Sequence, residues 1–200
     1  GYGMAEALAA AYASIAVWGR KDAANQAAVE SLSKLGAGEV KAWTVDVSDE
    51  QAVVDATADV VSSMGRIDSC FANAGVGFGA PSFTEMTTEI WRKNMAVNLD
   101  GAFWTLRESV KHMTERAKAG DPGGSVVGVA SLAGIEGAAR NMTELAQDSD
   151  GFTTKVITRV PIRRWGEPED FGGMAVYLAS DASRYHSGTT CIIDGGYAIF

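Results

Sequence analysis

A serine placed to take part in proton transfer stands at position 131, directly after the apolar, small-residue run VVGVA at 126–130. A serine after such a strand-like run is typical of an active site, and its proton-transfer partner would follow a few helical turns later. Residues 132–155 are instead polar and loop-like, and no such partner occurs among them. The sequence therefore presents either an enzyme without its acid or a chain with a part missing.

Other small or polar residues follow strand-like runs in the same way as Ser131. They are Gly19-Arg20, Asp46 and Asn73-Ala74-Gly75. In a parallel sheet the carboxyl ends of the strands share one rim, and ligands bind there, near the point where the strand order reverses. We therefore expect these residues and Ser131 to lie on one ligand-binding rim.

Strand-like and helix-like segments alternate along the chain. Strands are predicted at 14–18, 40–45, 67–72, 125–130 and 189–193. Helices are predicted at 4–13, at 22–35, from Ser48 or Asp49 as N-cap to Met64, at 87–113 as one long or two broken helices, and at 167–179. This alternation predicts an α/β fold, a single Rossmann-type doubly wound parallel sheet with helices on both faces, with residues 1–200 as one domain.

Composition and charge exclude several classes of function. The chain has 200 residues and a net charge of -8, and this acidity argues against a nucleic-acid partner. No apolar run reaches the length of a membrane span. Cys70 and Cys191 are expected to be buried free thiols, and His112 and His186 are too few for a metal-ligand cluster. We therefore expect a cytoplasmic domain that binds no metal.

The motifs at the strand ends, taken in order, resemble those of the classical short-chain dehydrogenase/reductase family, and the resemblance covers nearly the whole chain. It begins with Gly1-Tyr2-Gly3-Met4-Ala5, which is similar to the tail of the family's glycine fingerprint. It continues through Asp46-Val47, Asn73-Ala74-Gly75, Val97-Asn98, Ser131 and Asp194-Gly195-Gly196. Each motif alone is weak, but their order, each at the expected strand end, is specific.

This resemblance implies a dinucleotide site. Gly1 would place a helix N-terminus against the pyrophosphate of the cofactor, where backbone N–H groups favour phosphate. Asp46, with the Val47 backbone beside it, would accept a hydrogen bond from the adenine amino group. Asn73-Ala74-Gly75 would close over the adenine ribose. The simpler alternatives are a flexible terminus for Gly1, a helix cap for Asp46 and a plain turn for Asn73-Ala74-Gly75.

The residues at 19–21 indicate which dinucleotide is preferred. Family members that prefer NAD usually carry an acid at the end of the second strand, where it holds the ribose 2′-hydroxyl. Here that place is Gly19, followed by Arg20 and Lys21. Glycine leaves room, and a guanidinium binds phosphate through two parallel hydrogen bonds. The sequence thus favours NADP(H) and leaves NAD(H) possible; a solvated basic turn is the simpler alternative.

The resemblance also assigns catalytic roles. The counterpart of Ser131 hydrogen-bonds the substrate carbonyl, and the counterpart of Asn98 keeps a water that links a lysine to solvent. That lysine and a tyrosine proton donor form a Tyr-x-x-x-Lys motif roughly a dozen residues after the serine. This chain lacks the motif, and Glu144 and Asp148, near the expected place, cannot replace a phenol assisted by a cation.

A second gap of the same kind lies at the start, because the first strand of a doubly wound sheet is central and none precedes the helix at 4–13. We therefore expect the sequence to represent an incomplete chain. The absent parts would be the first strand with its phosphate loop and a segment between about Asn141 and Met142. Residues 142–156 would then be the tail of a substrate lid or, alternatively, a surface loop. A genuinely truncated polypeptide is the competing account.

The main functional prediction is an NAD(P)-dependent oxidoreductase that interconverts a carbonyl and an alcohol by hydride transfer, with NADP(H) favoured. A catalytically inactive nucleotide-binding member, acting as a sensor or scaffold, is the first alternative. A structural subunit that binds no dinucleotide is the second. The family resemblance implies a homo-oligomer, a tetramer formed through the long helices and the apolar ending Tyr197-Ala198-Ile199-Phe200.

Overall fold

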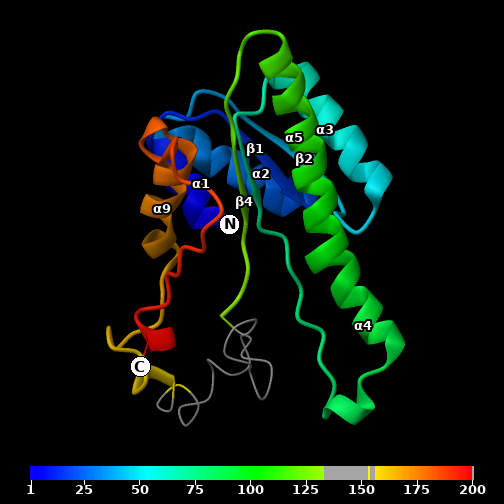
Figure 1. Ribbon diagram of the computed structural model, residues 1–200, viewed down its shortest axis with the longest axis vertical. Helices are drawn as coiled ribbons and strands as arrows, with labels where there is room; N and C mark the ends of the chain where they lie inside the picture. Colours follow the sequence, from blue (N-terminus) through cyan, green and yellow to red (C-terminus); the bar gives the residue numbers. More distant parts are fainter. Residues whose placement is uncertain (133–152, 154–155, 200) are drawn as a thin grey trace.

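Parallel strands form the centre of the protein in the computed structural model, which describes residues 1–132, 153 and 156–199 (Figure 1). Strand β1 (Ile15–Gly19) pairs with β2 (Val40–Thr44), and β3 (Ser69–Ala72) pairs with β4 (Ser125–Gly128). Both pairs are parallel, with Gly19 opposite Thr44 and Ala72 opposite Gly128. The carboxyl ends of the strands in each pair are therefore aligned, as the predicted rim requires.

The described strands form two separate pairs, whereas the sequence predicted one continuous sheet. A cavity of about 1070 Å³ is lined by every residue of β1 and every residue of β3. The paired strands β2 and β4 contribute none of its lining. The free edges of β1 and β3 therefore face a common space, and this space divides the sheet.

Helices α1 (Tyr2–Ala10), α2 (Asp22–Leu32) and α3 (Glu50–Met64) follow the predicted order. Helix α3 begins where the Asp49 carboxylate accepts hydrogen bonds from the backbone N–H groups of Gln51 and Ala52, which selects Asp49 over Ser48 as the N-cap. A short 3-10 turn, Ser33–Leu35, ends α2, and Gly36 with φ 92° allows the chain to reverse there.

Two small cores fix these helices on the strands. Ala9, Ile15 and Leu32 join α1, β1 and α2. Val45, Val53 and Ala56 join the end of β2 to α3, with Trp104 packed against them. Burial of these side chains supplies the main favourable free energy of the N-terminal half.

The long helical segment predicted at 87–113 consists of α4 (Thr88–Met95), a π-helical stretch (Ala96–Gly101) and α5 (Ala102–Lys118). The Thr87 hydroxyl caps α4 by accepting from the Ile90 N–H group. Asn98 lies within the π-helical stretch, a conformation that is rare and often found at functional sites. Figure 1 shows α3 and α5 on one side of the strands and α1 and α9 on the other.

The C-terminal part differs from the prediction in one element. A 3-10 turn (Pro168–Phe171) opens the predicted helix and leads into α9 (Gly172–Ala179), with a capping box formed by Glu167 and Asp170. Residues 189–193, predicted as a strand, have no regular structure. A strand needs a neighbouring backbone to satisfy its N–H and C=O groups, and no described strand pairs with this segment.

Several predictions from composition can be compared with the described residues. Cys70 and Cys191 are free thiols, as predicted, but both are only partly buried. In the described part of the chain, no group of histidine, cysteine or acidic side chains is arranged to hold a metal ion. None of the described helices is both long and apolar enough to span a bilayer. The cytoplasmic location stays a prediction.

Candidate functional site

The residues predicted to bind the cofactor all line the cavity between β1 and β3. They are Gly1, Gly19, Arg20, Asp46, Val47, Asn73, Ala74 and Gly75. They come from the start of α1 and from the segments that follow β1, β2 and β3. The structure therefore brings together side chains and backbone that are up to 74 positions apart, from Gly1 to Gly75, around one cavity.

Gly1 and Asn73 are in close contact on this rim. A Cβ atom at position 1 would lie 2.7 Å from Asn73 Nδ2, so a larger residue would displace that side chain. Gly1 is also the N-cap of α1, a helix with no acidic residue in its first turn. An anion at this end would face free N–H groups and the positive end of the helix dipole. The arrangement fits a phosphate group.

Asp46, which follows β2, adds a negatively charged side chain to the cavity lining. Its Oδ1 atom accepts hydrogen bonds from the Ser48 backbone N–H at 3.0 Å and the Ser48 hydroxyl at 2.7 Å. These bonds, with a smaller contribution from the positive charge of Arg20, lower the pKa of Asp46. Asp46 does not cap α3, because Asp49 does. Its carboxylate is therefore an ionised acceptor on the rim.

The end of β1 is braced by a residue that the sequence analysis did not select. Asn25, in the first turns of α2, is only 4% exposed, and its Nδ2 donates to the Gly19 carbonyl at 3.0 Å and to the Trp43 carbonyl at 3.1 Å. It thus ties α2 to β1 and β2. An asparagine in a helix has no distinctive sequence signal, and the nearby Gly19 was the only indication of close packing.

The loop after β3 is held by two asparagines of the α4–π–α5 segment. Asn98 accepts from the Val76 N–H at 2.8 Å and donates to the Val76 carbonyl at 2.9 Å. Asn94 accepts from the Phe78 N–H at 3.0 Å and donates to the Phe78 carbonyl at 2.8 Å. Asn94 was also missed by sequence reasoning. The predicted catalytic residue Asn98 therefore has its side-chain amide paired with the loop backbone.

The two predicted catalytic residues do not line the cavity. Ser131 is exposed and follows β4 by three positions, beyond Gly128. Asn98 is likewise absent from the cavity lining, although its neighbour Val97 belongs to it. The predicted lid at 142–156 lies outside the described residues except for Thr153 and Val156. The residues predicted to bind the cofactor thus lie around one cavity, and Ser131 lies one position before residue 132, where the first described range ends.

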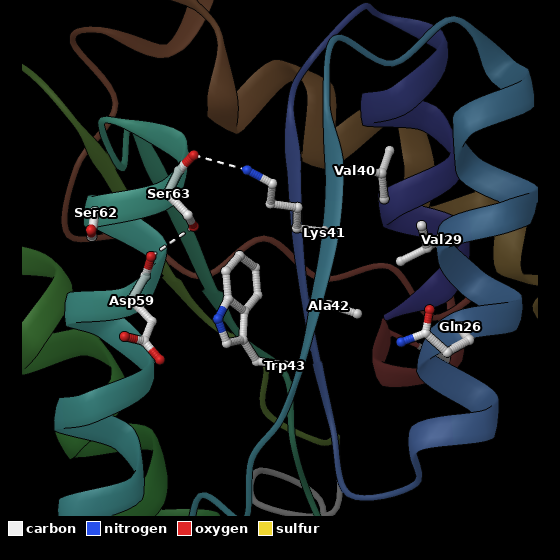
Figure 2. Close-up of a pocket in the computed structure, with 9 residues that line it drawn as sticks. All are labelled: Gln26, Val29, Val40, Lys41, Ala42, Trp43, Asp59, Ser62 and Ser63. Carbon is white, nitrogen blue, oxygen red and sulfur yellow. Dashed lines mark hydrogen bonds between the residues drawn. The ribbon is translucent and has the colours of Figure 1, made fainter.

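A smaller hollow of about 490 Å³ lies at the other edge of β2, between α2 and α3 (Figure 2). In Figure 2 the Lys41 side chain reaches toward α3, where its Nζ donates to the Ser63 carbonyl at 2.9 Å. A lysine on an edge strand discourages pairing with a further strand. None of the predicted site residues lines this hollow. Lys41 therefore protects this edge of the sheet, and the hollow is not part of the candidate site.

Comparison with known proteins places these features in a family. The sequence pattern of the family described as "short chain dehydrogenase" matches residues 1–143, and that described as "Enoyl-(Acyl carrier protein) reductase" matches residues 139–198. The fold and rim define a dinucleotide-binding α/β protein of the Rossmann class. The chain belongs to the short-chain dehydrogenase/reductase family.

Individual relatives agree with this assignment. A sorbose reductase of Schizosaccharomyces pombe is 28% identical over 237 residues, covering 98% of this chain and 91% of the relative. An NADP-dependent (R)-specific alcohol dehydrogenase of Lentilactobacillus kefiri is 26% identical over 225 residues, covering 92% of this chain and 86% of the relative. A short-chain type dehydrogenase/reductase of Mycobacterium ulcerans superposes with a TM-score of 0.87 at 25% identity, covering 98% of this chain and 85% of that one.

These findings confirm the predicted family and the Rossmann-type α/β fold. They also confirm the predicted class of activity. The protein is an NAD(P)-dependent oxidoreductase that acts on the CH–OH groups of small-molecule alcohols and on the corresponding carbonyl groups. The cofactor fits the residues present, because an anion-binding helix end, an ionised acceptor and a glycine-lined rim surround one cavity.

Proposed function

We propose that this protein is an NADP(H)-preferring enzyme that interconverts a ketone or aldehyde with the corresponding alcohol. The observation that carries the preference is the end of β1, where Arg20 follows Gly19 on the cavity rim and the last position of the strand is a glycine instead of an acid. A carboxylate there would repel a 2′-phosphate, whereas an arginine binds phosphate through its planar fork of donors. Arg20 is exposed, so it is accessible to such a ligand.

Each part of the rim has a role in this proposal. The bound dinucleotide supplies or accepts the hydride. Gly1 and the N-terminus of α1 bind the pyrophosphate, Asp46 accepts a hydrogen bond from the adenine amino group, and Asn73 and Gly75 line the ribose. Ser131 binds the carbonyl oxygen of the substrate. Asn98 acts through the Val76 backbone, which it holds with both ends of its amide.

Replacement of Arg20 by serine tests the cofactor preference. We expect the dissociation constant for NADPH to rise about tenfold, which corresponds to the loss of about 1.4 kcal/mol, while that for NADH stays unchanged. Fluorescence titration of both dinucleotides measures the two constants. Lys21→Ser is the matched control, since Lys21 is an exposed cation next in sequence that does not line the cavity. Equal losses for both dinucleotides in Arg20→Ser would contradict the proposal.

An inactive nucleotide-binding member is the second candidate, favoured by the absence of a Tyr-x-x-x-Lys motif from residues 1–200. It predicts NADPH binding without turnover of any carbonyl substrate. Binding and turnover measured on the same preparation separate the two functions. Turnover supports the enzyme, and binding alone supports a sensor or scaffold.

We also propose that the complete polypeptide contributes one more parallel strand and one more internal segment. The strand would occupy the part of the cavity that lies between the free edges of β1 and β3, and the rim at the carboxyl ends of the strands would remain for the cofactor. The segment is supported by the sorbose reductase, whose 237 aligned residues exceed the 200 residues of this chain. Intact mass spectrometry tests both additions. A mass well above 21.0 kDa supports them, and a mass of 21.0 kDa supports a truncated polypeptide.

The α4–π–α5 segment supports the predicted homo-oligomer. Trp91, Leu99, Phe103 and Val110 are large apolar side chains that remain 43–60% exposed along it. Large apolar side chains that gather on an exposed face are a feature of protein–protein contacts. We propose that a second copy covers it. Phe103→Glu should then shift the protein toward the monomer in size-exclusion chromatography with light scattering, and an unchanged mass would contradict the proposal.

A further inference from the structure

The backbone at Gly19 is not what restricts this position to glycine. Its φ lies outside the left-handed region, so a residue with a side chain meets no conformational barrier there. The restriction is steric instead. A Cβ atom built on Gly19 would collide with the Oδ1 atom of Asn25, and the other two nearest atoms also belong to the Asn25 side chain. The Asn25 side chain therefore occupies the space that a side chain at position 19 would need.

Asn25 cannot easily give up this space. It is 4% exposed, and its Nδ2 donates to the carbonyls of Gly19 and Trp43. Rotation of the amide away from position 19 would break both bonds and leave a buried polar group without a partner, which is costly. Gly19 and Asn25 are thus a matched pair, because the Asn25 amide fits in its place only when position 19 has no side chain.

We infer that Asn25 is a specificity-determining residue for the cofactor, because it excludes from the end of β1 the acidic side chain that would bind a ribose 2′-hydroxyl. A carboxylate at this point selects NAD in dinucleotide-binding folds. Its exclusion leaves Arg20, next to Gly19 in the cavity lining, as the charged residue that directly follows the end of β1. The inference rests on the proposed NADP(H) preference and gives it a structural cause in α2.

The pairing predicts that cofactor preference cannot be reversed at position 19 alone. Gly19→Asp places a carboxylate against Asn25, so the variant should melt roughly 5 °C below wild type and gain no NADH affinity. Gly19→Asp with Asn25→Ala removes the obstacle. The double variant should bind NADH about tenfold more tightly than Gly19→Asp does and bind NADPH more weakly than wild type.

A second cycle with alanine isolates the steric part from the charge. Gly19→Ala should lower the melting temperature, whereas the same substitution in an Asn25→Ala background should lower it no further. Gly173→Ala is the matched control, since Gly173 in α9 has no atom near its absent Cβ and no left-handed φ. That control should melt at or above the temperature of wild type, because alanine has the higher helix propensity.

Differential scanning fluorimetry and titration with NADPH and NADH give the outcomes. A wild-type melting temperature for Gly19→Ala would overturn the inference, and so would NADH affinity in Gly19→Asp equal to that of the double variant. If wild type binds NADH as well as NADPH, the proposed preference has failed and the inference falls with it. If wild type prefers NADPH but the single and double variants behave alike, the inference alone has failed.

Discussion

The ends of β1 and β3 are both braced by asparagine side chains, but the two braces differ in burial and in what they hold. At the end of β1, Asn25 is buried and fills the space beside Gly19. At the end of β3, the half-buried Asn94 and the exposed Asn98 hold the loop backbone at Phe78 and Val76. The buried brace decides which side chain the rim can carry, and the exposed brace decides the course of the loop.

The largest effect is expected when the buried brace is removed. Asn25→Leu deprives the Gly19 and Trp43 carbonyls of a donor and puts a bulkier side chain against Gly19. We expect the free energy of unfolding to fall by about 2–3 kcal/mol, measured by urea denaturation. The exposed Gln26 next to it, whose amide donates a long hydrogen bond to the Asp22 carboxylate at 3.5 Å, provides the control in Gln26→Leu. Equal free energies of unfolding for the two variants would show that the hydrogen bonds of Asn25 do not stabilise the fold.

A smaller effect is expected at the β3 brace. Asn94→Leu removes the acceptor of the Phe78 N–H group and the donors to the Phe78 and Ile90 carbonyls. Because these groups can bond to water instead, the free energy of unfolding should fall by only about 1 kcal/mol. The more direct signal is faster hydrogen exchange at the Phe78 amide, measured by NMR.

Lys93→Ala provides the control for the β3 brace, because Lys93 lies on the same helix but forms an ion pair with Glu89 on the surface, at 2.7 Å. Its Phe78 amide should exchange as in wild type. Equal exchange rates at Phe78 in Asn94→Leu and wild type would show that Asn94 does not protect the Phe78 amide.

The smallest effect concerns the rim charge that follows β2. The pKa of Asp46 lies below its ordinary value of 3.8 in the folded protein, chiefly because of the bonds from Ser48. Its carboxylate therefore stabilises the fold above pH 3.8, and this contribution is lost as the pH falls through the lowered pKa. Asp46→Asn should melt slightly below wild type at pH 7, and the difference should shrink toward pH 3. If the difference in melting temperature between Asp46→Asn and wild type grew on acidification, the pKa of Asp46 would be raised and not lowered in the folded protein.

The rim could be predicted from the sequence because Asp46 and Asn73 directly follow apolar strand runs, and parallel strands bring their carboxyl ends together. Asn25 and Asn94 could not be predicted. Each lies in a helix, where asparagine is usually a surface residue, and only the packing of α2 on Gly19 or of α4 on the loop gives it a role.

The irregular course of 189–193 was not predicted, for a related reason. Local apolar patterning predicts that a strand forms, but whether it forms depends on the neighbour that pairs with it. Cys191 and Ile193 have the composition of a strand, and no described strand lies beside them. The π-helical turn at Asn98 was likewise not predicted, because the apolar pattern at 87–113 indicated only one long or two broken helices.

The spacing of Asn94 and Asn98 has a consequence for how the loop after β3 tolerates change. Asn94 lies near the end of α4, and Asn98 lies about one helical turn further on, in the π-helical stretch. Two amides one helical turn apart therefore address alternate loop residues, Phe78 and Val76, much as a neighbouring strand would. The spacing of the two asparagines on the helical segment thus sets the spacing of the loop residues that they hold. A one-residue insertion between Val76 and Phe78 would put the two out of phase, whereas insertions beyond Phe78 would leave the match intact.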